Sequence, residues 1–403
     1  MVHVALTETL VLRFADVGVA TYASLRVVGD PVKTVTWVVE QQDLAGAAQR
    51  LAEALPDPVG TETRHDALDR AITTGAFSSP TTEFELARAL GTHLLAPAAW
   101  KLLVDHATPP ATLFVSPSAK LARMPWGLLA APGDEGTRLM ELVEVLMAAP
   151  PNIVNSPRAS ADWNGRRDDP VLVVLDPRVP GQRPDSALGS VLGRPSPDTV
   201  LARHFADLGC RRTLLPDAES VVELFRRTDA DRGWLAAHLG RRPGRMVYVG
   251  HATAADGDAG HADRAALHLA EERPLTAGEL MTARLQFPPR VALLACASGG
   301  DYQFDEASGL VAAMVLGGAQ LVTATLWSLP TTAGYRQFAG SDADPMSEAI
   351  VAVDSAHESD DAGRAVNAWQ RQRQRMRDWR DGDRSASPLY WAALVSFAVD
   401  GAR

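Results

Sequence analysis

A cysteine and a histidine each follow a short apolar run in the second half of the chain. Cys296 comes directly after Val291–Ala295, and His251 comes after Met246–Val249 and one glycine. An imidazole beside a thiol can take its proton and leave a thiolate, which is a strong nucleophile. The two residues therefore predict nucleophilic catalysis, with Cys296 as the nucleophile and His251 as the general base.

The order of these two residues also matches a known pattern. Caspases carry their histidine about 50 residues before the catalytic cysteine, and here the distance along the chain is 45 residues, from 251 to 296. Ser298-Gly299-Gly300 follows the cysteine and predicts a turn whose backbone amides could stabilise an oxyanion. A single buried cysteine is more often structural than catalytic, but the pair in this order favours catalysis.

The elements that would position this pair belong to an alternating pattern. Short apolar, mostly β-branched runs, typical of strands buried on both faces of a sheet, lie at Thr112–Val115, Val143–Met147, Val171–Leu175, Met246–Val249, Val291–Ala295 and Leu321–Leu326. Helical patterns lie between the later runs, at 200–208, 220–239, 276–282 and 306–316. Such alternation predicts an α/β fold with a largely parallel sheet flanked by helices. Catalytic groups gather at the carboxyl edge of such a sheet.

A smaller strand-and-helix unit is predicted over residues 1–110. Its strands are expected at Leu10–Phe14, Ala20–Val27 and Val35–Val39, and Gln42–Leu55 has apolar residues at helical spacing. Pro109-Pro110 marks the expected boundary, with the larger domain over 111–403.

Five further segments complete the pattern. Residues 155–169 and 177–197 are rich in Pro, Gly, Arg and Ser and predict exposed loops, and 340–361, which is acidic at both ends, is expected to be mobile as well. Residues 363–380 predict a long, polar, Arg-rich helix with a solvated face. Residues 389–399 are apolar again and are expected to dock on the core.

Composition excludes several classes of function. The chain has 403 residues, 46% of them apolar, and a formal net charge of −10, which argues against a nucleic-acid partner. No run approaches the roughly 18 apolar residues of a spanning helix, so no membrane insertion is expected. With two cysteines and no secretory signal, a reduced, cytoplasmic protein is expected, and Cys210 is interpreted as a bystander.

No cofactor or metal is expected either. The loop with Asp256, Asp258, His261 and Asp263 lacks the two-histidine helical spacing of a zinc site, so these residues are interpreted as solvated. The glycine pairs at 299–300 and 317–318 do not fit a phosphate-binding loop.

Several strings, in order, resemble the CHAT family of bacterial caspase-like cysteine peptidases, which are related to the separases. The resemblance covers roughly residues 110–400 and rests on Thr112–Pro117, Leu121–Leu129, Leu172–Pro177, Val247–His251, Val291–Gly299, Asp305–Leu310, Gly317–Trp327 and Tyr390–Leu394. It implies a caspase-like fold, with 112–215 as a degenerate half without chemistry and 216–403 as the catalytic half.

The resemblance also implies a role for individual residues. His251 would be the base, Cys296 the nucleophile, and the backbone of Ala252 and Cys296 would supply the oxyanion donors. The chain departs from the family at Ala252, where a glycine is usual. A positive φ at that position would strain an alanine.

A second departure concerns the substrate pocket. Leu294 stands where several caspase relatives place a polar pocket residue. A carboxylate for a basic substrate side chain would therefore come from Asp301 or Asp305, although acidic residues before a helix more often cap it.

The expected function is that of a cysteine endopeptidase. By the resemblance, it would be a regulated protease of a bacterial defence or cell-death module, acting on a protein substrate encoded by a neighbouring gene and switched on by a sensor protein. Two alternatives remain: a catalytically silent scaffold or interaction protein of the same fold, and a doubly wound small-molecule enzyme or nucleotide binder. The second would need a glycine-rich phosphate loop.

Overall fold

The structure is a computed structural model that describes residues 8–108, 110–133, 136–158, 162–183, 186, 188–253, 262–295, 309–371 and 375–399. Within these ranges, eleven strands form one sheet in the order β3-β2-β1-β4-β5-β14-β13-β12-β8-β6-β7. The strands are β1 (Thr9–Asp16), β2 (Ala20–Val27), β3 (Asp30–Glu40), β4 (Thr112–Ser116), β5 (Glu144–Ala148), β6 (Val171–Leu175), β7 (Leu214–Leu215), β8 (Arg245–Gly250), β12 (Arg290–Ala295), β13 (Leu321–Thr325) and β14 (Leu394–Ala398). A small second sheet contains β9 (Ala252–Thr253), β10 (Ala266–Leu267) and β11 (Leu275–Thr276).

The large sheet consists of two parallel groups that run in opposite directions. One group is β1, β4, β5 and β14, and the other is β13, β12, β8, β6 and β7. They meet where β13 and β14 pair antiparallel, and β2 and β3 extend the first group as antiparallel strands. The prediction of an α/β fold with a largely parallel sheet is confirmed.

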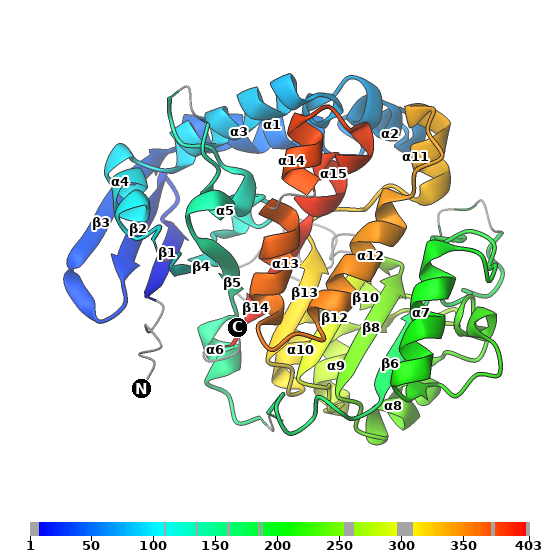
Figure 1. Ribbon diagram of the computed structural model, residues 1–403. Helices are drawn as coiled ribbons and strands as arrows, with labels where there is room; N and C mark the ends of the chain where they lie inside the picture. The colour runs from blue at the N-terminus through cyan, green and yellow to red at the C-terminus, as the bar shows by residue number, and fades with distance from the viewer. Residues whose placement is uncertain are drawn as a thin grey trace.

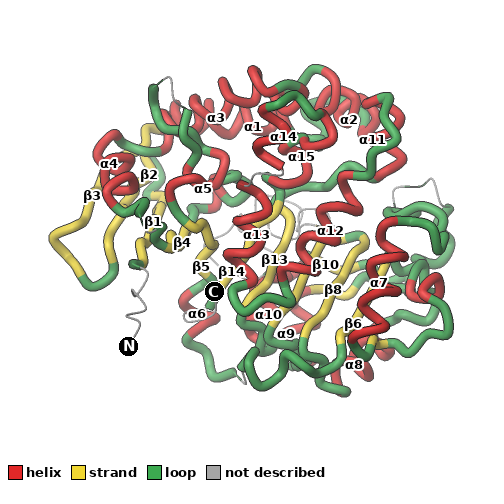
Figure 2. Tube along the Cα trace, viewed as in Figure 1, coloured by secondary structure: helices red, strands yellow, loops and turns green. Residues whose placement is uncertain are grey.

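Helices cover both faces of this sheet (Figures 1 and 2). They are α1 (Gln41–Ala54), α2 (Arg64–Thr73), α3 (Pro80–Leu94), α4 (Pro97–Asp105), α5 (Leu139–Leu142), α6 (Pro151–Val154), α7 (Val200–Arg211), α8 (Arg232–Gly240), α9 (Ala277–Ala283), α10 (Leu310–Leu316), α11 (Thr332–Ala339), α12 (Pro345–Ala356), α13 (Ala362–Arg371), α14 (Arg375–Arg380) and α15 (Pro388–Trp391). Helices α7, α12 and α13 lie side by side on the face toward the viewer, whereas α9 and α10 pack together on the far face (Figure 1).

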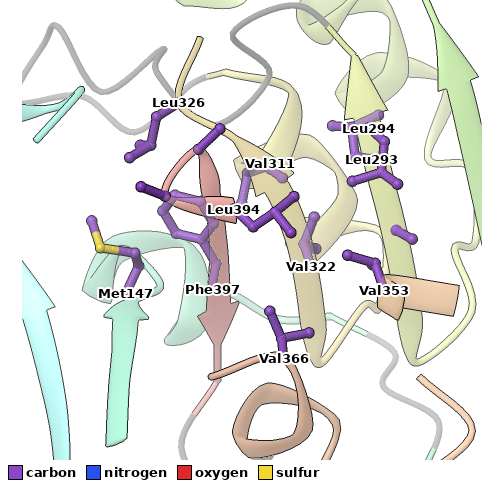
Figure 3. Close-up of a cluster of buried hydrophobic side chains, with 14 of the residues drawn as sticks. Met147, Leu293, Leu294, Val311, Val322, Leu326, Val353, Val366, Leu394 and Phe397 are labelled. Carbon is purple, nitrogen blue, oxygen red and sulfur yellow. The ribbon is translucent and has the colours of Figure 1, made fainter. Parts of the chain in front are cut away.

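A cluster of buried apolar side chains lies where the two strand groups meet. Figure 3 shows Phe397 of β14 and Val322 of β13 in one cluster with Val353 of α12 and Val366 of α13. All four side chains are buried. The apolar run at 389–399 thus forms a short helix and a central strand, which confirms that it docks on the core.

Two segments differ from the sequence-based expectation, and a third has a buried face that was not predicted. No helix was predicted within 340–361, but residues 345–356 form α12, whose Ile350 and Val353 face the core between the acidic ends. The helix expected over 220–239 is broken, since Arg226 adopts a left-handed conformation (φ 55°) between a 3₁₀ turn and α8. The Arg-rich segment expected as a helix with a solvated face has an exposed side, on which Arg377 is 70% exposed, and α13 buries its other face, including Val366.

The N-terminal segment shares the sheet with the rest of the chain. β1 pairs with β4 in parallel, and Glu83 of α3 accepts a hydrogen bond from Arg138 at 2.8 Å, with both side chains 2% exposed.

The two predicted halves of the larger domain, 112–215 and 216–403, also share the sheet. β6 and β7, which precede residue 216, pair beyond β8 in the same strand group. The strand order therefore interleaves segments from both predicted halves.

Candidate functional site

The two central strands of the second group end together at one edge of the sheet. β8 and β12 pair in parallel, and the register places Gly250 opposite Ala295. These are the residues directly before His251 and Cys296. Every residue of both strands is buried, which fixes where each strand ends. The sequence-based expectation that the two strands are neighbours is confirmed.

Two groups hold the backbone of His251. The hydroxyl of Tyr248, a fully buried residue, donates to the carbonyl of His251 at 2.9 Å and to that of His268 at 2.8 Å. The backbone N–H of His268 donates to the same His251 carbonyl at 3.0 Å. Gly250 leaves room for this arrangement, because a Cβ there would lie 2.9 Å from the Tyr248 hydroxyl oxygen. The main chain at His251 is therefore fixed from two directions.

The imidazole of His251 is half-buried and contacts a loop from another part of the chain. Its Nε2 lies 2.9 Å from the carbonyl oxygen of Gly189. A carbonyl can only accept, so Nε2 must carry the proton and donate it. In the neutral ring, Nδ1 then holds the basic lone pair. The contact sets the tautomer that a general base needs for accepting a proton at Nδ1.

A second histidine lies next to the candidate base. His268 is nearly buried, and its ring Nε2 is hydrogen-bonded to the hydroxyl of Thr253. Burial lowers the pKa of His268, and the nearby charge of His251 lowers it further. His268 is therefore neutral at neutral pH, and it adds no positive charge beside His251.

The backbone after His251 continues into the small second sheet. Ala252 begins β9 and pairs with Leu267 of β10. Its φ is not positive, since the non-glycine residues with positive φ in the described ranges are Asp176, Arg226, Arg242 and Arg284. An alanine where the family usually has glycine is thus accommodated without strain.

The Gly189 loop is held by a buried carboxylate that sequence reasoning did not single out. Asp176 follows β6, is fully buried, and accepts from the Ser190 hydroxyl (2.8 Å) and from the backbone N–H groups of Val191 and Leu192 (3.1 and 3.2 Å). The loop was expected to be exposed, but Val191 is buried. The sequence signal was present as the Leu172–Pro177 string, without an assigned role.

Three predicted site residues lie outside the described residues: Cys296, Asp301 and Asp305. The loop residues Asp256, Asp258 and His261 also lie outside them. Cys210 is described, on α7, as an exposed free thiol.

The described part of the chain shows neither a metal-binding cluster nor a membrane-spanning helix. No group of three or more His, Cys, Asp or Glu side chains in it could hold a metal ion. Nor is any helix there long and apolar enough to cross a membrane.

Most of the chain matches one known domain family. The model of the CHAT domain matches residues 84–399. No curated protein matches the chain. Two crystal structures of the Saccharomyces cerevisiae separase–securin complex are similar to it, one at 12% identity and a TM-score of 0.47 over 98% of this chain, the other at 10% and 0.44 over 97%. This chain spans 30% of the length of each of those matched chains. Because the family model matches well over half of its residues, the chain belongs to the CHAT domain family, a caspase-like protease family.

Proposed function

We propose that the protein is a cysteine endopeptidase in which His251 and Cys296 form the catalytic dyad. The observation that carries the proposal is the register of β8 and β12, which pairs Gly250 with Ala295. Adjacent parallel strands that stop at the same level deliver the residues after them to the same place at the carboxyl edge. Family membership over residues 84–399 supports the same reaction class.

The proposed reaction begins with proton transfer from the thiol of Cys296 to Nδ1 of His251. The thiolate attacks the carbonyl carbon of the scissile peptide bond, and the carbonyl oxygen becomes an oxyanion. Backbone N–H groups at Ala252 and Cys296 would stabilise that charge. The tetrahedral intermediate collapses as the C–N bond breaks, and the imidazolium gives its proton to the leaving amine.

Hydrolysis of the resulting thioester completes the cycle. His251 takes a proton from a water molecule, whose oxygen attacks the thioester carbonyl. The C–S bond then breaks, the proton returns to the sulfur, and a carboxylic acid leaves. The hydrogen bond from Nε2 to Gly189 supports both halves of the cycle, because it keeps Nδ1 as the basic nitrogen.

The proposal extends to specificity. Leu294 is buried in β12 and offers no charge to a substrate pocket. A preference for Arg or Lys beside the scissile bond would then depend on Asp301 or Asp305, because a desolvated cation needs a carboxylate partner. Profiling of a peptide library with Asp301→Ala and Asp305→Ala tests this dependence. Arg selectivity that survives both substitutions would place the carboxylate elsewhere.

The biological setting is part of the proposal as well. We infer a regulated protease of a bacterial defence or cell-death module, whose protein substrate and activating sensor are encoded nearby. Co-expression with the neighbouring gene products tests this inference. The expected result is cleavage of one of them by the wild-type chain, and the contrary result is that none is cleaved or alters activity.

Labelling of the nucleophile tests the dyad directly. A tagged peptidyl acyloxymethyl ketone, which reacts with activated thiolates, is expected to label Cys296 and to spare Cys210, with the site identified by mass spectrometry. Cys296→Ala should abolish labelling, whereas Cys210→Ala, at an exposed free thiol, should leave it unchanged. His251→Ala should slow labelling about 100-fold or more, the usual contribution of a general base. Labelling of Cys296 at an unchanged rate in His251→Ala would reject the dyad.

A further inference from the structure

The Gly189 carbonyl that contacts His251 is held in place by a cluster of buried groups. The guanidinium of Arg226 donates to this carbonyl at 3.1 Å and also to both carboxylate oxygens of Asp176 at 3.3 Å. Gly189 therefore accepts hydrogen bonds from His251 and from Arg226 at one oxygen. The side chain of Asp176 is fully buried and that of Arg226 is 15% exposed.

Two strained residues build this cluster. Asp176 (φ 50°) and Arg226 (φ 55°) both adopt left-handed backbone conformations, which are costly for residues with a Cβ. Their backbones interlock, since the N–H of Arg226 donates to Leu175 at 2.9 Å and that of Asp176 donates to Val249 of β8 at 2.6 Å. Such strain is concentrated at functional sites when the surrounding structure holds it in place.

The hydrogen-bond donors to Asp176 show which part of the chain its carboxylate holds in place. Its carboxylate accepts from the Ser190 hydroxyl and from two successive backbone N–H groups, at Val191 and Leu192. It therefore holds the three residues that directly follow Gly189. Together with Arg226, which binds the carbonyl of Gly189 itself, it fixes the loop at Gly189 and over the three residues after it.

We propose that Asp176 and Arg226 are positioning residues of the catalytic dyad. Together they hold the carbonyl of Gly189 on Nε2 of His251, and so set the tautomer and the orientation of the base. This inference rests on the proposed function. It assigns a role to the Leu172–Pro177 string, in which Asp176 is the residue after the strand.

The test measures how fast iodoacetamide alkylates Cys296 in the full chain, from about pH 5 to about pH 9, the range that brackets imidazole and thiol titration. Cys210, exposed on the same chain, is the internal reference. In the wild type, Cys296 should react at lower pH than Cys210, and His251→Ala should remove this difference. Asp176→Asn and Arg226→Met should each slow alkylation of Cys296 about tenfold or more at neutral pH, as is typical when a supporting partner is lost. Arg226→Lys, which keeps the charge and one donor, should be intermediate.

Arg245→Lys is the matched control. Arg245 is also a buried arginine paired with a buried carboxylate, that of Asp354, but it lies at the other end of β8, about 20 Å from His251 at roughly 3.3 Å per strand residue. It should leave the pH profile of Cys296 unchanged. Melting temperatures of all variants show which are folded. If Arg226→Met does not fold, Ser190→Ala, which removes one donor to Asp176, replaces it and should slow alkylation a few-fold.

The outcomes separate the two proposals. A wild-type profile in folded Asp176→Asn and Arg226→Met, with loss of reactivity in His251→Ala, would overturn the positioning role and leave the dyad intact. An identical Cys296 profile in the wild type and in His251→Ala would instead overturn the proposed function.

Discussion

The hydroxyl of Tyr248 connects two segments of the chain, the end of β8 at the candidate base His251 and the segment at His268. It donates to the carbonyls of His251 and His268, so one side chain holds both residues at the end of β8. A tyrosine between the buried Val247 and Val249 is explained by this contact, because a buried hydroxyl needs a partner.

Tyr248→Phe is therefore expected to lower both stability and catalysis. Loss of the donor leaves the His268 carbonyl without this hydrogen bond, which costs about 1–3 kcal/mol of unfolding free energy. The cleavage or labelling rate should fall as well, since His251 loses a backbone contact. Thermal melts and labelling kinetics measure the two effects.

Tyr390→Phe is the control for that substitution. Tyr390 is 2% exposed, and its hydroxyl has no hydrogen-bond partner among the described residues. Removal of an unsatisfied hydroxyl is expected to be neutral or slightly stabilising. An equal loss of stability in both variants would show that the Tyr248 hydroxyl makes no special contribution.

At the scale of elements, the buried strands could be predicted from the sequence because apolar, β-branched runs of five or six residues stand between polar breakers. The same pattern predicted where β8 and β12 end. It therefore also predicted that His251 lies at the end of β8. Helix α12 was missed because acidic residues at both ends concealed the helical spacing of Ile350 and Val353. The contact from Gly189 could not be predicted, since a backbone carbonyl is the same in every residue type.

The packing of α12 predicts a dependence of stability on pH. His357 ends this helix, is fully buried, and is hydrogen-bonded through Nε2 to the Thr323 hydroxyl at 2.7 Å. Burial lowers its pKa to about 3, and the charges of Arg245 and Arg290 contribute to the shift. In the unfolded chain the imidazole of His357 becomes protonated as the pH falls below about 6.5. In the folded state it stays neutral down to a much lower pH.

The direction in which stability changes with pH follows from the difference between the pKa of His357 in the folded and in the unfolded state. The contribution of neutral His357 to stability is complete above about pH 6.5 and is lost as the pH falls toward about 3. The slope for one proton is about 1.4 kcal/mol per pH unit. His357→Gln should show a weaker decrease over this range, measured as unfolding free energy in urea at several pH values. An unchanged slope in the variant would assign the pH dependence to other groups.

At the scale of the whole molecule, the strand order joins distant segments of the chain. β14, from the end of the chain, separates β5 from β13, and β1 lies against β4. Phe77 stacks on Trp327 with ring centroids 6.0 Å apart, and its carbonyl accepts from the Ser387 hydroxyl at 3.0 Å. The first 110 residues thus contribute to the same core as the strands that carry the candidate site. No local pattern in the sequence specifies this order, because it depends on pairings between residues hundreds of positions apart.

Removal of residues 1–110 is accordingly expected to prevent stable folding of the remainder. The deletion exposes the edge of β4 and leaves the buried Arg138 without Glu83, and an uncompensated buried charge alone costs about 3–5 kcal/mol. Circular dichroism melts of 111–403 and of the full chain measure the effect. A cooperative melt of 111–403 within a few degrees of the full chain would contradict this integration.

We propose that Cys296, activated by His251, hydrolyses peptide bonds. The most direct measurement is sequencing of the new amino termini that form when a proteome-derived peptide library is incubated with the wild-type chain and with Cys296→Ala. The wild type is expected to give a defined set of cleavage sites and the variant none, while both chains melt at similar temperatures. Cleavage of the same bonds at the same rate by Cys296→Ala would contradict it.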